Sequence, residues 1–317
     1  MNAVFLDFAT MGSDELNLSP LTKLLPDLVL HATSNRDEII SRIADAEYAL
    51  INKSRLDAEA LSTAKSLRYI GLAATGSDNV DLEYAREAGI AVTNIRGYCT
   101  QSVVEQVFGV MLMLTHNLHR YRRAVGEGRW QAASTFALLD YPIRELSAMT
   151  LGIVGFGELG QNVARMAETF GMQVVIAQRP GGEPVAGRLS FEELLKVSDV
   201  VSLHCPLTES TRGLMSHDAF RLMRKDAILI NTARGALVDS EALVEALETD
   251  QIGGAAVDVL SEEPPVSGDP LLDYRGDRLV LTPHIAWATR EARQKAIEEL
   301  ALNVAAYQEG RARCRLA

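Results

Sequence analysis

Three charged or titratable side chains stand directly after apolar runs in the second half of the chain. Arg234 follows the run ILIN, the adjacent acids Glu262 and Glu263 follow AAVDV, and His284 follows LVLTP. Because the carboxyl ends of parallel strands meet at one edge of a sheet, we expect an arginine, a glutamate and a histidine to face one crevice.

Such a set suits the reduction of a 2-keto acid. The planar guanidinium of Arg234 can bind a carboxylate through two hydrogen bonds and polarise the keto oxygen. The imidazole of His284 can donate a proton to the developing alkoxide. A carboxylate on the other ring nitrogen would orient the imidazole and favour its protonated form. A nucleotide cofactor would supply the hydride.

The segment GFGELG has the spacing of a dinucleotide-binding turn, with glycines at 155, 157 and 160. It follows the apolar run LGIV and opens a helical pattern, which is the context that such a turn requires. We expect Gly155 to allow the tight turn, Gly157 to admit a pyrophosphate and Gly160 to permit close packing of helix on strand. The alternative is a structural glycine turn in a flavodoxin-like domain.

The second strand of this unit ends without the expected acid, in Gln178 and Arg179. A carboxylate there would bind the adenosine ribose, whereas Arg179 can pair with a 2′-phosphate. Pro180 and the pair Gly181–Gly182 are interpreted as a turn that holds the guanidinium over the ribose. We therefore predict NADP(H) as the cofactor. The alternative is NAD(H), with Gln178 on the ribose and Arg179 solvated.

Short apolar runs alternate with helical periods along almost the whole chain. Five runs, from AVFLDF to IAVTN, precede residue 96, and six more, from TLGIVGF to LVLTPH, follow residue 149. This alternation predicts an α/β protein with two doubly wound parallel sheets. We expect a flavodoxin-like substrate domain and a Rossmann cofactor domain, with a cleft between them.

Two long helical patterns, at 100–121 and 289–310, are interpreted as crossovers between the domains. The second crossover would return the chain to the first domain. This predicts a discontinuous substrate domain, 1–100 with 289–317, and a dinucleotide-binding domain at 101–288.

The composition of the chain indicates which kinds of partner it is not expected to bind. The 317 residues carry a net charge of −11, which argues against a nucleic-acid partner. The longest apolar run, Val107–Leu114, is far shorter than the ~20 residues that span a bilayer, so no membrane partner is expected. Cys99, Cys205 and Cys314 have neither disulfide nor metal spacing, which favours a reduced, cytoplasmic location and no metal.

The motifs together resemble the D-isomer-specific 2-hydroxyacid dehydrogenases over nearly the whole length. They are YIGLAATGSDNVDLEYAREAGIAVTN, GFGELG, LHCPLT, NTARGALVD, AVDVLSEEPP and TPHIAWAT. The segments INK, ATG, GYCTQSV and HIAW are most like the branch of glycerate dehydrogenases and hydroxypyruvate (glyoxylate) reductases.

This resemblance implies an enzyme that interconverts small 2-keto acids and D-2-hydroxy acids, with glyoxylate and hydroxypyruvate as expected substrates. It selects Glu263 over Glu262 as the partner of His284, because the family's acid directly precedes a proline. The alternative is a non-catalytic regulator that senses nucleotides on the same fold. The intact Arg234, Glu263 and His284 disfavour it.

The resemblance also implies further contacts. Backbone N–H groups of Thr75 and Gly76 would share the substrate carboxylate, and Asp258 would bind the nicotinamide carboxamide. Lys53 and Trp287 are expected to line the substrate end of the cleft. The remaining cofactor contacts that it implies are Glu158, Leu159, His204, Cys205, Pro206, Thr211, Thr232, Ala233 and Ala286.

The last expectation from the sequence concerns the oligomeric state. The segment 126–146 has weak periodicity and is interpreted as an arm or loop that carries Trp130 and Phe136. This arm and the helical pattern before it hold more apolar surface than one domain can cover. Since the family's habit is a twofold dimer built on this region, we predict a homodimer.

Overall fold

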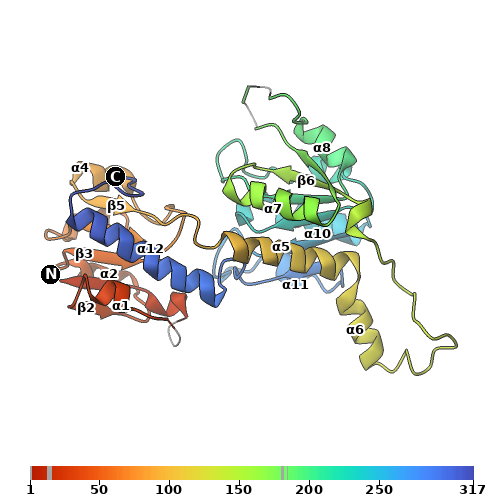
Figure 1. Cartoon of the computed structure of the whole chain (residues 1–317), viewed down its shortest axis with the longest axis horizontal. Helices are drawn as coiled ribbons and strands as arrows, with labels where there is room; N and C mark the ends of the chain where they lie inside the picture. The colour runs from red at the N-terminus through yellow and green to blue at the C-terminus, as the bar shows by residue number, and fades with distance from the viewer. Residues whose placement is uncertain (1, 13–15, 180–181, 184) are drawn as a thin grey trace. The chain divides into compact units, whose positions relative to one another are not determined.

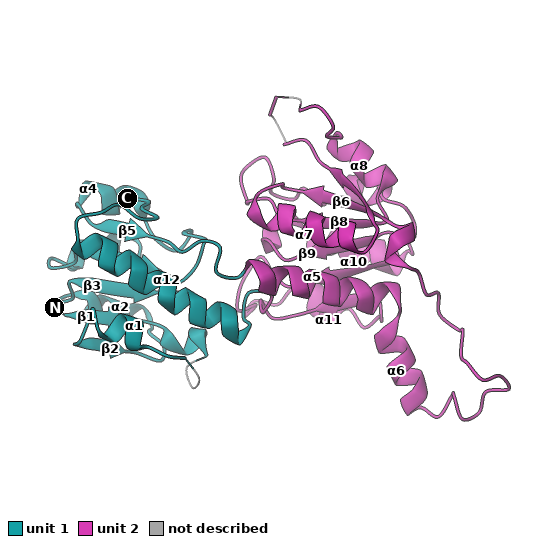
Figure 2. Cartoon of the chain, viewed as in Figure 1, with its two compact units in different colours: residues 1–99, 287–317 teal, residues 100–286 magenta. Residues whose placement is uncertain are grey.

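A computed structural model describes most of the chain. The described residues are 2–12, 16–179, 182–183 and 185–317. They form two compact units, one from residues 1–99 and 287–317 and the other from residues 100–286 (Figure 2). Each unit is built on one parallel sheet with helices on its faces (Figure 1).

The first unit contains a five-stranded sheet in the order β2-β1-β3-β4-β5, and every strand pair in it is parallel. Its strands are β1 (Ala3–Phe5), β2 (Leu28–Leu30), β3 (Tyr48–Ile51), β4 (Tyr69–Leu72) and β5 (Ala91–Thr93). This is the flavodoxin-like order, in which the direction of winding reverses beside β1. The reversal lies between β1 and β3, and crevices for ligands form at such points.

Helices cover both faces of this sheet. They are α1 (Ser19–Thr22), α2 (Arg36–Ile43), α3 (Ala58–Thr63), α4 (Leu82–Glu87) and α12 (Arg290–Gln308). Successive side chains of a strand point to opposite faces. Phe5 accordingly packs in the core under α12 with Leu300, while Val4 packs in the core on the other face with Ile39.

The second unit contains a six-stranded parallel sheet in the order β11-β10-β9-β8-β6-β7. Its strands are β6 (Thr150–Val154), β7 (Gln173–Ile176), β8 (Val200–Leu203), β9 (Ile228–Asn231), β10 (Gly254–Val257) and β11 (Leu279–Leu281). Here the winding reverses between β6 and β8, because β6 pairs with both β7 and β8. Two parallel-sheet α/β units confirm the predicted fold class.

Helices again flank the sheet. They are α5 (Thr100–Thr115), α6 (Leu118–Gly126), α7 (Glu158–Thr169), α8 (Phe191–Val197), α9 (His217–Leu222), α10 (Ser240–Glu248) and α11 (Pro270–Asp273). Short 3-10 turns at Phe8–Met11, Leu146–Ala148 and Gly235–Leu237 complete the two units. The short α1 and α11 and the 3-10 turns were not expected from the sequence.

The prediction of a single helix over 100–121 is wrong. The helix stops at Thr115, and a second helix starts at Leu118 after Asn117, whose φ of 52° is left-handed. A left-handed residue cannot continue a right-handed helix. The Asn117 side chain stabilises this break by donating to the Pro142 carbonyl oxygen at 2.7 Å.

Residues 127–145, all of them described, form turns and extended chain without a regular element. Within this arm the Trp130 indole donates to the Phe136 carbonyl oxygen at 2.9 Å. The Phe136 side chain is 94% exposed.

Candidate active site

Arg234 is held by a polar loop at the carboxyl end of β9. The Asn231 side chain accepts from the Ala233 N–H at 3.0 Å and donates to the Arg234 carbonyl oxygen at 2.9 Å. The next residue, Gly235, lies so close to Leu260 that a Cβ would stand 2.0 Å from the Leu260 carbonyl carbon. Glycine is therefore required there, and the loop of Arg234 packs directly on the loop that follows β10.

Glu263 and His284 form a hydrogen-bonded pair. Glu263 Oε2 lies 2.5 Å from His284 Nδ1, and Glu263 Oε1 accepts from the Leu260 N–H at 2.8 Å. The side chains of His284 and Glu263 are 28% and 34% exposed, so a small ligand can reach them. The neighbouring Glu262 instead accepts from Ser267.

His284 has a strained backbone with φ of 55°. Such a conformation costs of order 1–3 kcal/mol for a residue other than glycine and persists only where the surroundings enforce it. Asp258 provides that enforcement. Its carbonyl oxygen accepts the His284 N–H at 2.7 Å, and its carboxylate accepts from Thr282 Oγ1 at 2.5 Å, Ile285 N–H at 2.9 Å and Ala286 N–H at 2.8 Å.

Asp258, which is 3% exposed, thus has a structural role that the sequence did not reveal. Its two carboxylate oxygens organise the His284 loop. Ala286, a predicted cofactor contact, is fixed in the same network, and its carbonyl oxygen accepts from Ser102 Oγ at 2.6 Å.

The glycine turn lies at the point where the winding of the second sheet reverses. Gly155, with φ of 98°, is so close to the loop after β8 that a Cβ would lie 2.5 Å from the Cys205 nitrogen. A Cβ on Gly160 would lie 2.1 Å from the Gly155 carbonyl oxygen, whereas one on Gly157 would meet nothing within 4 Å. Gly157 therefore borders open space at the start of α7, and no side chain caps that helix.

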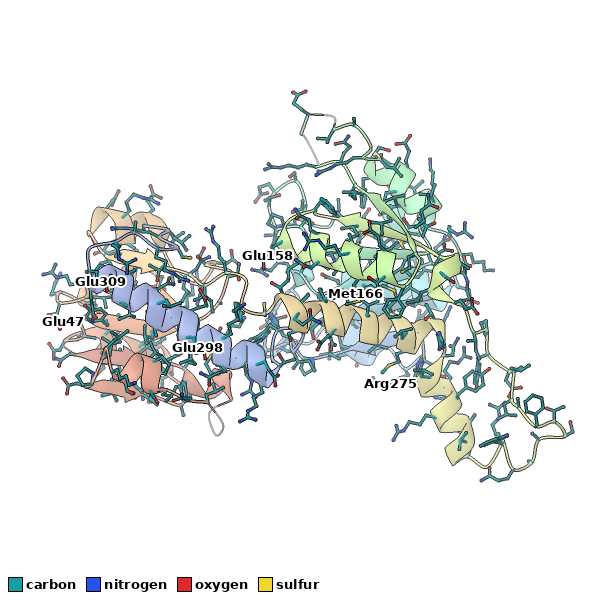
Figure 3. All side chains as sticks on the ribbon, viewed as in Figure 1. Glu47, Glu158, Met166, Arg275, Glu298 and Glu309 are labelled. Atoms are coloured by element: carbon teal, nitrogen blue, oxygen red, sulfur yellow. The ribbon has the colours of Figure 1, made fainter. Side chains whose placement is uncertain are left out.

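The first turn of α7 is free for an anion. Glu158 lies exposed at this end of the helix (Figure 3), and Leu159 beside it is half-buried. Unsatisfied N–H groups and the helix dipole make such a turn a binding site for phosphate. This geometry fits a dinucleotide pyrophosphate.

Two buried polar atoms beyond the turn lack a partner among the described residues. They are Nδ1 of His204, after β8, and the hydroxyl of Thr232, after β9. The other ring nitrogen of His204 lies 2.9 Å from Ser202 Oγ. Burial lowers the pKa of His204 to about 4, so the ring is neutral near pH 7. Orphaned polar atoms at this edge fit a polar ligand that would pair with them.

Thr211 shapes the loop that follows β8. Its hydroxyl donates to the Pro206 carbonyl oxygen at 2.8 Å and accepts from the Thr208 N–H at 2.8 Å. Cys205, in the same loop, is a buried free thiol whose pKa is raised by burial. These contacts fix the loop that carries the predicted cofactor contacts His204, Cys205 and Pro206.

The predicted ribose reader Gln178 is engaged within the protein. Its amide donates to the Val185 carbonyl oxygen at 2.9 Å and accepts from the Val185 N–H at 3.2 Å. Arg179 is exposed. The predicted turn residues Pro180 and Gly181 lie outside the described residues.

The predicted substrate contacts Lys53, Thr75, Gly76 and Trp287 belong to the first unit. Lys53 and Thr75 are exposed and follow the paired strands β3 and β4. The Thr75 carbonyl oxygen accepts from Asn94 Nδ2 at 2.7 Å, which fixes this turn. Trp287 packs edge-on against Tyr98, with 6.3 Å between ring centres. Arg234, Glu263 and His284 belong to the second unit.

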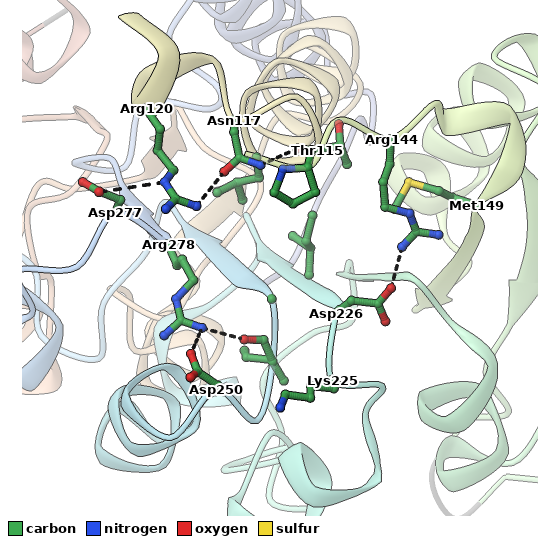
Figure 4. A pocket seen from close by; sticks show the side chains of 15 residues that line it. Thr115, Asn117, Arg120, Arg144, Met149, Lys225, Asp226, Asp250, Asp277 and Arg278 are labelled. Carbon is green, nitrogen blue, oxygen red and sulfur yellow. Dashed lines mark hydrogen bonds and ion pairs between the residues drawn. The ribbon is translucent and has the colours of Figure 1, made fainter. Parts of the chain in front are cut away.

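The second unit also contains a cavity of about 520 Å³ beside the amino ends of β9 and β10 (Figure 4). Its charged side chains are largely paired with one another, Arg144 with Asp226 at 2.8 Å and Arg278 with Asp250 at 2.7 Å. None of the predicted site residues lines it.

Neither a metal site nor a membrane-spanning helix is found among the described residues. No group of three or more histidine, cysteine, aspartate or glutamate side chains in the described ranges is placed to hold a metal ion. Among the helices that the structure describes, none combines the length and apolarity needed to cross a bilayer.

The chain belongs to the D-isomer-specific 2-hydroxyacid dehydrogenase family, whose NAD binding domain matches residues 108–286. It is similar to a glycerate dehydrogenase of Methylorubrum extorquens, with 41% identity over 280 residues that cover 88% of each chain. It is also similar to a hydroxypyruvate reductase of Blautia hydrogenotrophica, with 33% identity over 98% of each chain.

One solved structure extends the likeness to both whole chains. It is an acyclic imino acid reductase in complex with NADPH and D-Arg, with a TM-score of 0.86, 27% identity and full coverage of each chain. The family and its glycerate and hydroxypyruvate branch, predicted from the motifs, are confirmed.

The buried His204 makes the stability of the cofactor-free protein depend on pH. Its pKa is about 4 when folded and 6.5 when unfolded, so the unfolded state binds more protons between these values. Stability is therefore full above pH 6.5 and falls as the pH drops toward 4. We expect this residue to contribute a loss of about 2 kcal/mol between pH 7 and pH 5.

Urea unfolding of wild type and His204→Gln at both pH values measures the difference. His217→Gln, whose side chain is 44% exposed, serves as the control and should keep the wild-type dependence. Equal pH dependence in wild type and His204→Gln would contradict a buried neutral imidazole.

Proposed function

We propose that the protein reduces small 2-keto acids, glyoxylate or hydroxypyruvate, to the corresponding 2-hydroxy acids, glycolate or D-glycerate. The single observation that carries this is the 2.5 Å contact between Glu263 and His284 on the sheet edge that also carries Arg234. The names of the two sequence relatives support the substrate class. The first unit acts as the substrate domain and the second binds the dinucleotide.

We assign a role to each residue of the site. Arg234 binds the substrate carboxylate and polarises the keto oxygen, while the Thr75 and Gly76 N–H groups share the carboxylate. His284 donates a proton from Nε2 to the developing alkoxide, and Glu263 on Nδ1 keeps the ring oriented. The glycine turn and the start of α7 hold the dinucleotide, with Asp258 toward its carboxamide. When bound, its nicotinamide supplies the hydride.

The alternative is a regulator that binds the nucleotide and a partner protein without turnover. Nothing in the geometry of the Glu263–His284 pair favours it, because a sensor needs no oriented proton donor. Oxidation of NADPH or NADH with a panel of keto acids separates the two functions.

Loss of the proton donor is the first test of this proposal. In His284→Ala, we expect turnover to fall by about 10²–10⁴-fold, since general acid catalysis contributes that much. Binding of the reduced cofactor, followed by fluorescence titration, should stay close to wild type.

The matched control is His217→Ala, which removes another histidine paired with a glutamate, 3.2 Å from Glu245 on the surface. It should keep wild-type turnover. If His284→Ala also keeps it, the proton comes from another group and the mechanism is wrong.

For the cofactor we propose NADP(H), with NAD(H) as the alternative. The support is local. The Gln178 amide is used by Val185, and position 178 itself carries no carboxylate to repel a 2′-phosphate. Arg179 is exposed, and the Arg188 guanidinium lies 5.8 Å from the ring of Phe156 in the glycine turn. The similar imino acid reductase was solved with NADPH, whereas the matching family domain is described as NAD binding.

Substitution of Arg179 tests this preference. A charge-assisted hydrogen bond is worth about 1.5–3 kcal/mol, so Arg179→Ala should raise KM for NADPH roughly ten- to a hundredfold and leave NADH nearly unchanged. Arg221→Ala, an exposed arginine on α9, is the control. A wild type that prefers NADH would refute the assignment while the dehydrogenase function stands.

For assembly we propose a homodimer. We also propose a cytoplasmic location, because the three cysteines have neither disulfide nor metal spacing. The support for the homodimer is a set of exposed apolar side chains that belong to α6 and the arm. They are Leu118, Val125, Trp130, Phe136, Leu139 and Ile143. So many large apolar side chains exposed along one segment mark a candidate protein–protein interface.

Sedimentation at micromolar concentration should give twice the 34.5 kDa chain mass. The variant Phe136→Ser with Leu139→Ser should shift the protein toward the monomer, because it removes apolar area from an interface expected to exceed about 1,000 Å². A monomeric wild type would refute the dimer.

A further inference from the structure

A buried amide braces the turn that is proposed to bind the substrate carboxylate. Asn94, which directly follows β5, is 4% exposed. Its Nδ2 donates to the Thr75 carbonyl oxygen at 2.7 Å. A carbonyl oxygen can only accept a hydrogen bond, so the NH2 group of the Asn94 amide, and not its oxygen, must lie beside it. The turn after β4 is thus tied to the segment after β5 by an oriented side chain.

Two further hydrogen bonds join the same segments. Thr75 Oγ1 donates to the Ile95 carbonyl oxygen at 3.0 Å, and the Ile95 N–H donates to the Ala74 carbonyl oxygen at 3.2 Å. Two successive carbonyl oxygens of the turn, those of Ala74 and Thr75, are therefore held by donors that follow β5.

Holding a carbonyl oxygen also orients the N–H group of the next residue. A peptide group is planar and trans, so its C=O and N–H point in opposite directions. The contact of Asn94 with the Thr75 carbonyl sets the direction of the Gly76 N–H. The contact of Ile95 with the Ala74 carbonyl does the same for the Thr75 N–H. Neither N–H group donates to any residue that the structure describes, so both are available to a carboxylate.

Asn94 is itself held from α12. Asn303, which is 1% exposed in that helix, donates from Nδ2 to the Asn94 carbonyl oxygen at 2.8 Å. Its Oδ1 accepts from Arg313, which also pairs with Glu299 at 2.6 Å. The Asn94 N–H donates to the Cys314 carbonyl oxygen at 3.2 Å. Both backbone groups of Asn94 are therefore fixed, and this fixes the base of its side chain.

One atom of this amide has no partner. Asn94 Oδ1 is buried and accepts no hydrogen bond from the described residues. A buried acceptor without a donor is unfavourable, and each such group in a native protein needs an explanation. The explanation here is that the position requires the donor, because only the NH2 group of the amide is used, and it is used on the turn.

We propose that Asn94 is a positioning residue of the reaction, which orients the Gly76 N–H toward the substrate carboxylate, and that Asn303 holds Asn94 in place from α12. This inference rests on the proposed function. It predicts that a donor at position 94 controls how tightly the first unit binds a carboxylate, although Asn94 itself need not contact the substrate.

Substitution of Asn94 provides the test. In Asn94→Ala, we expect KM for glyoxylate and hydroxypyruvate to rise about ten- to a hundredfold, the range for a hydrogen bond to a charged group. Since the carboxylate contact is made in the ground state and the transition state alike, kcat should change less than about threefold. The inhibition constant of oxalate, which has a carboxylate but no keto carbon to accept hydride, should rise with KM. Binding of NADPH, followed by fluorescence titration, should stay at the wild-type value.

A second variant covers the case in which Asn94→Ala does not fold. Thr75→Val keeps the shape of an exposed side chain and both N–H groups of the turn, and it removes only the hydroxyl contact with Ile95. We expect KM for both acids to rise about two- to tenfold, the range for a neutral hydrogen bond.

The role of Asn303 is tested in two backgrounds. Asn303→Asp keeps an acceptor for Arg313 and loses the donor to the Asn94 carbonyl oxygen. It should raise KM in the wild type and have no further effect in Asn94→Ala, because it acts through the Asn94 side chain. A further rise in the double variant would contradict this route.

The matched control is an asparagine that stabilises the same unit elsewhere. Asn35 caps α2, where its Oδ1 accepts from the Glu38 N–H at 2.9 Å. The strand before α2 is β2, which lies at the opposite edge of the sheet from β5. Asn35→Ala should lower the urea midpoint, because an N-cap is lost, and leave KM and the oxalate constant unchanged.

Unchanged KM and oxalate constants in both Asn94→Ala and Thr75→Val would overturn the inference. A loss of NADPH binding as large as the loss of oxalate binding in Asn94→Ala would also overturn it. Failure of the proposed function looks different, because the wild type would then reduce neither acid with either cofactor.

Discussion

In each unit, a buried aspartate at the carboxyl end of a strand holds a loop that carries a predicted site residue. Parallel strands deliver their loops to one edge of a sheet, and the N–H groups of those loops need acceptors once water is excluded. Asp258 supplies acceptors to the loop of His284, and Asp7 supplies them to the loop of Lys53. In both units the aspartate positions a side chain that is expected to contact the substrate. The aspartate itself need not contact the substrate.

The same constraint explains the close approach of loops around Arg234. Gly235 lets that loop lie against the Leu260 backbone, and the Leu260 N–H in turn fixes Glu263. Arg234, Glu263 and His284 follow adjacent strands, so their separation depends on strand spacing and on these backbone contacts. The proposed chemistry needs side chains held within fractions of an ångström, and backbone contacts provide that better than flexible side chains alone.

Much of this could be predicted from the sequence. Apolar runs fix the strands, and motif context fixes the glycine turn, because both depend on local pattern. The break at Asn117 could not be predicted, since it depends on the distant Pro142. The anchoring roles of Asp7 and Asp258 were missed for a similar reason. A lone aspartate after a strand identifies a possible acceptor, but the donors come from another loop, and only the folded chain brings them together.

The left-handed backbone of His284 has an evolutionary consequence. Glycine, asparagine, aspartate and histidine adopt such a conformation more readily than other residues, whereas β-branched and bulky side chains are strongly disfavoured in it. A single-base change to tyrosine, another acid–base residue, would add backbone strain to the loss of the Glu263 contact. Descendants of this sequence can therefore diversify through other loops more readily than through the proposed proton donor, which leaves the reaction type conserved while the range of acids drifts.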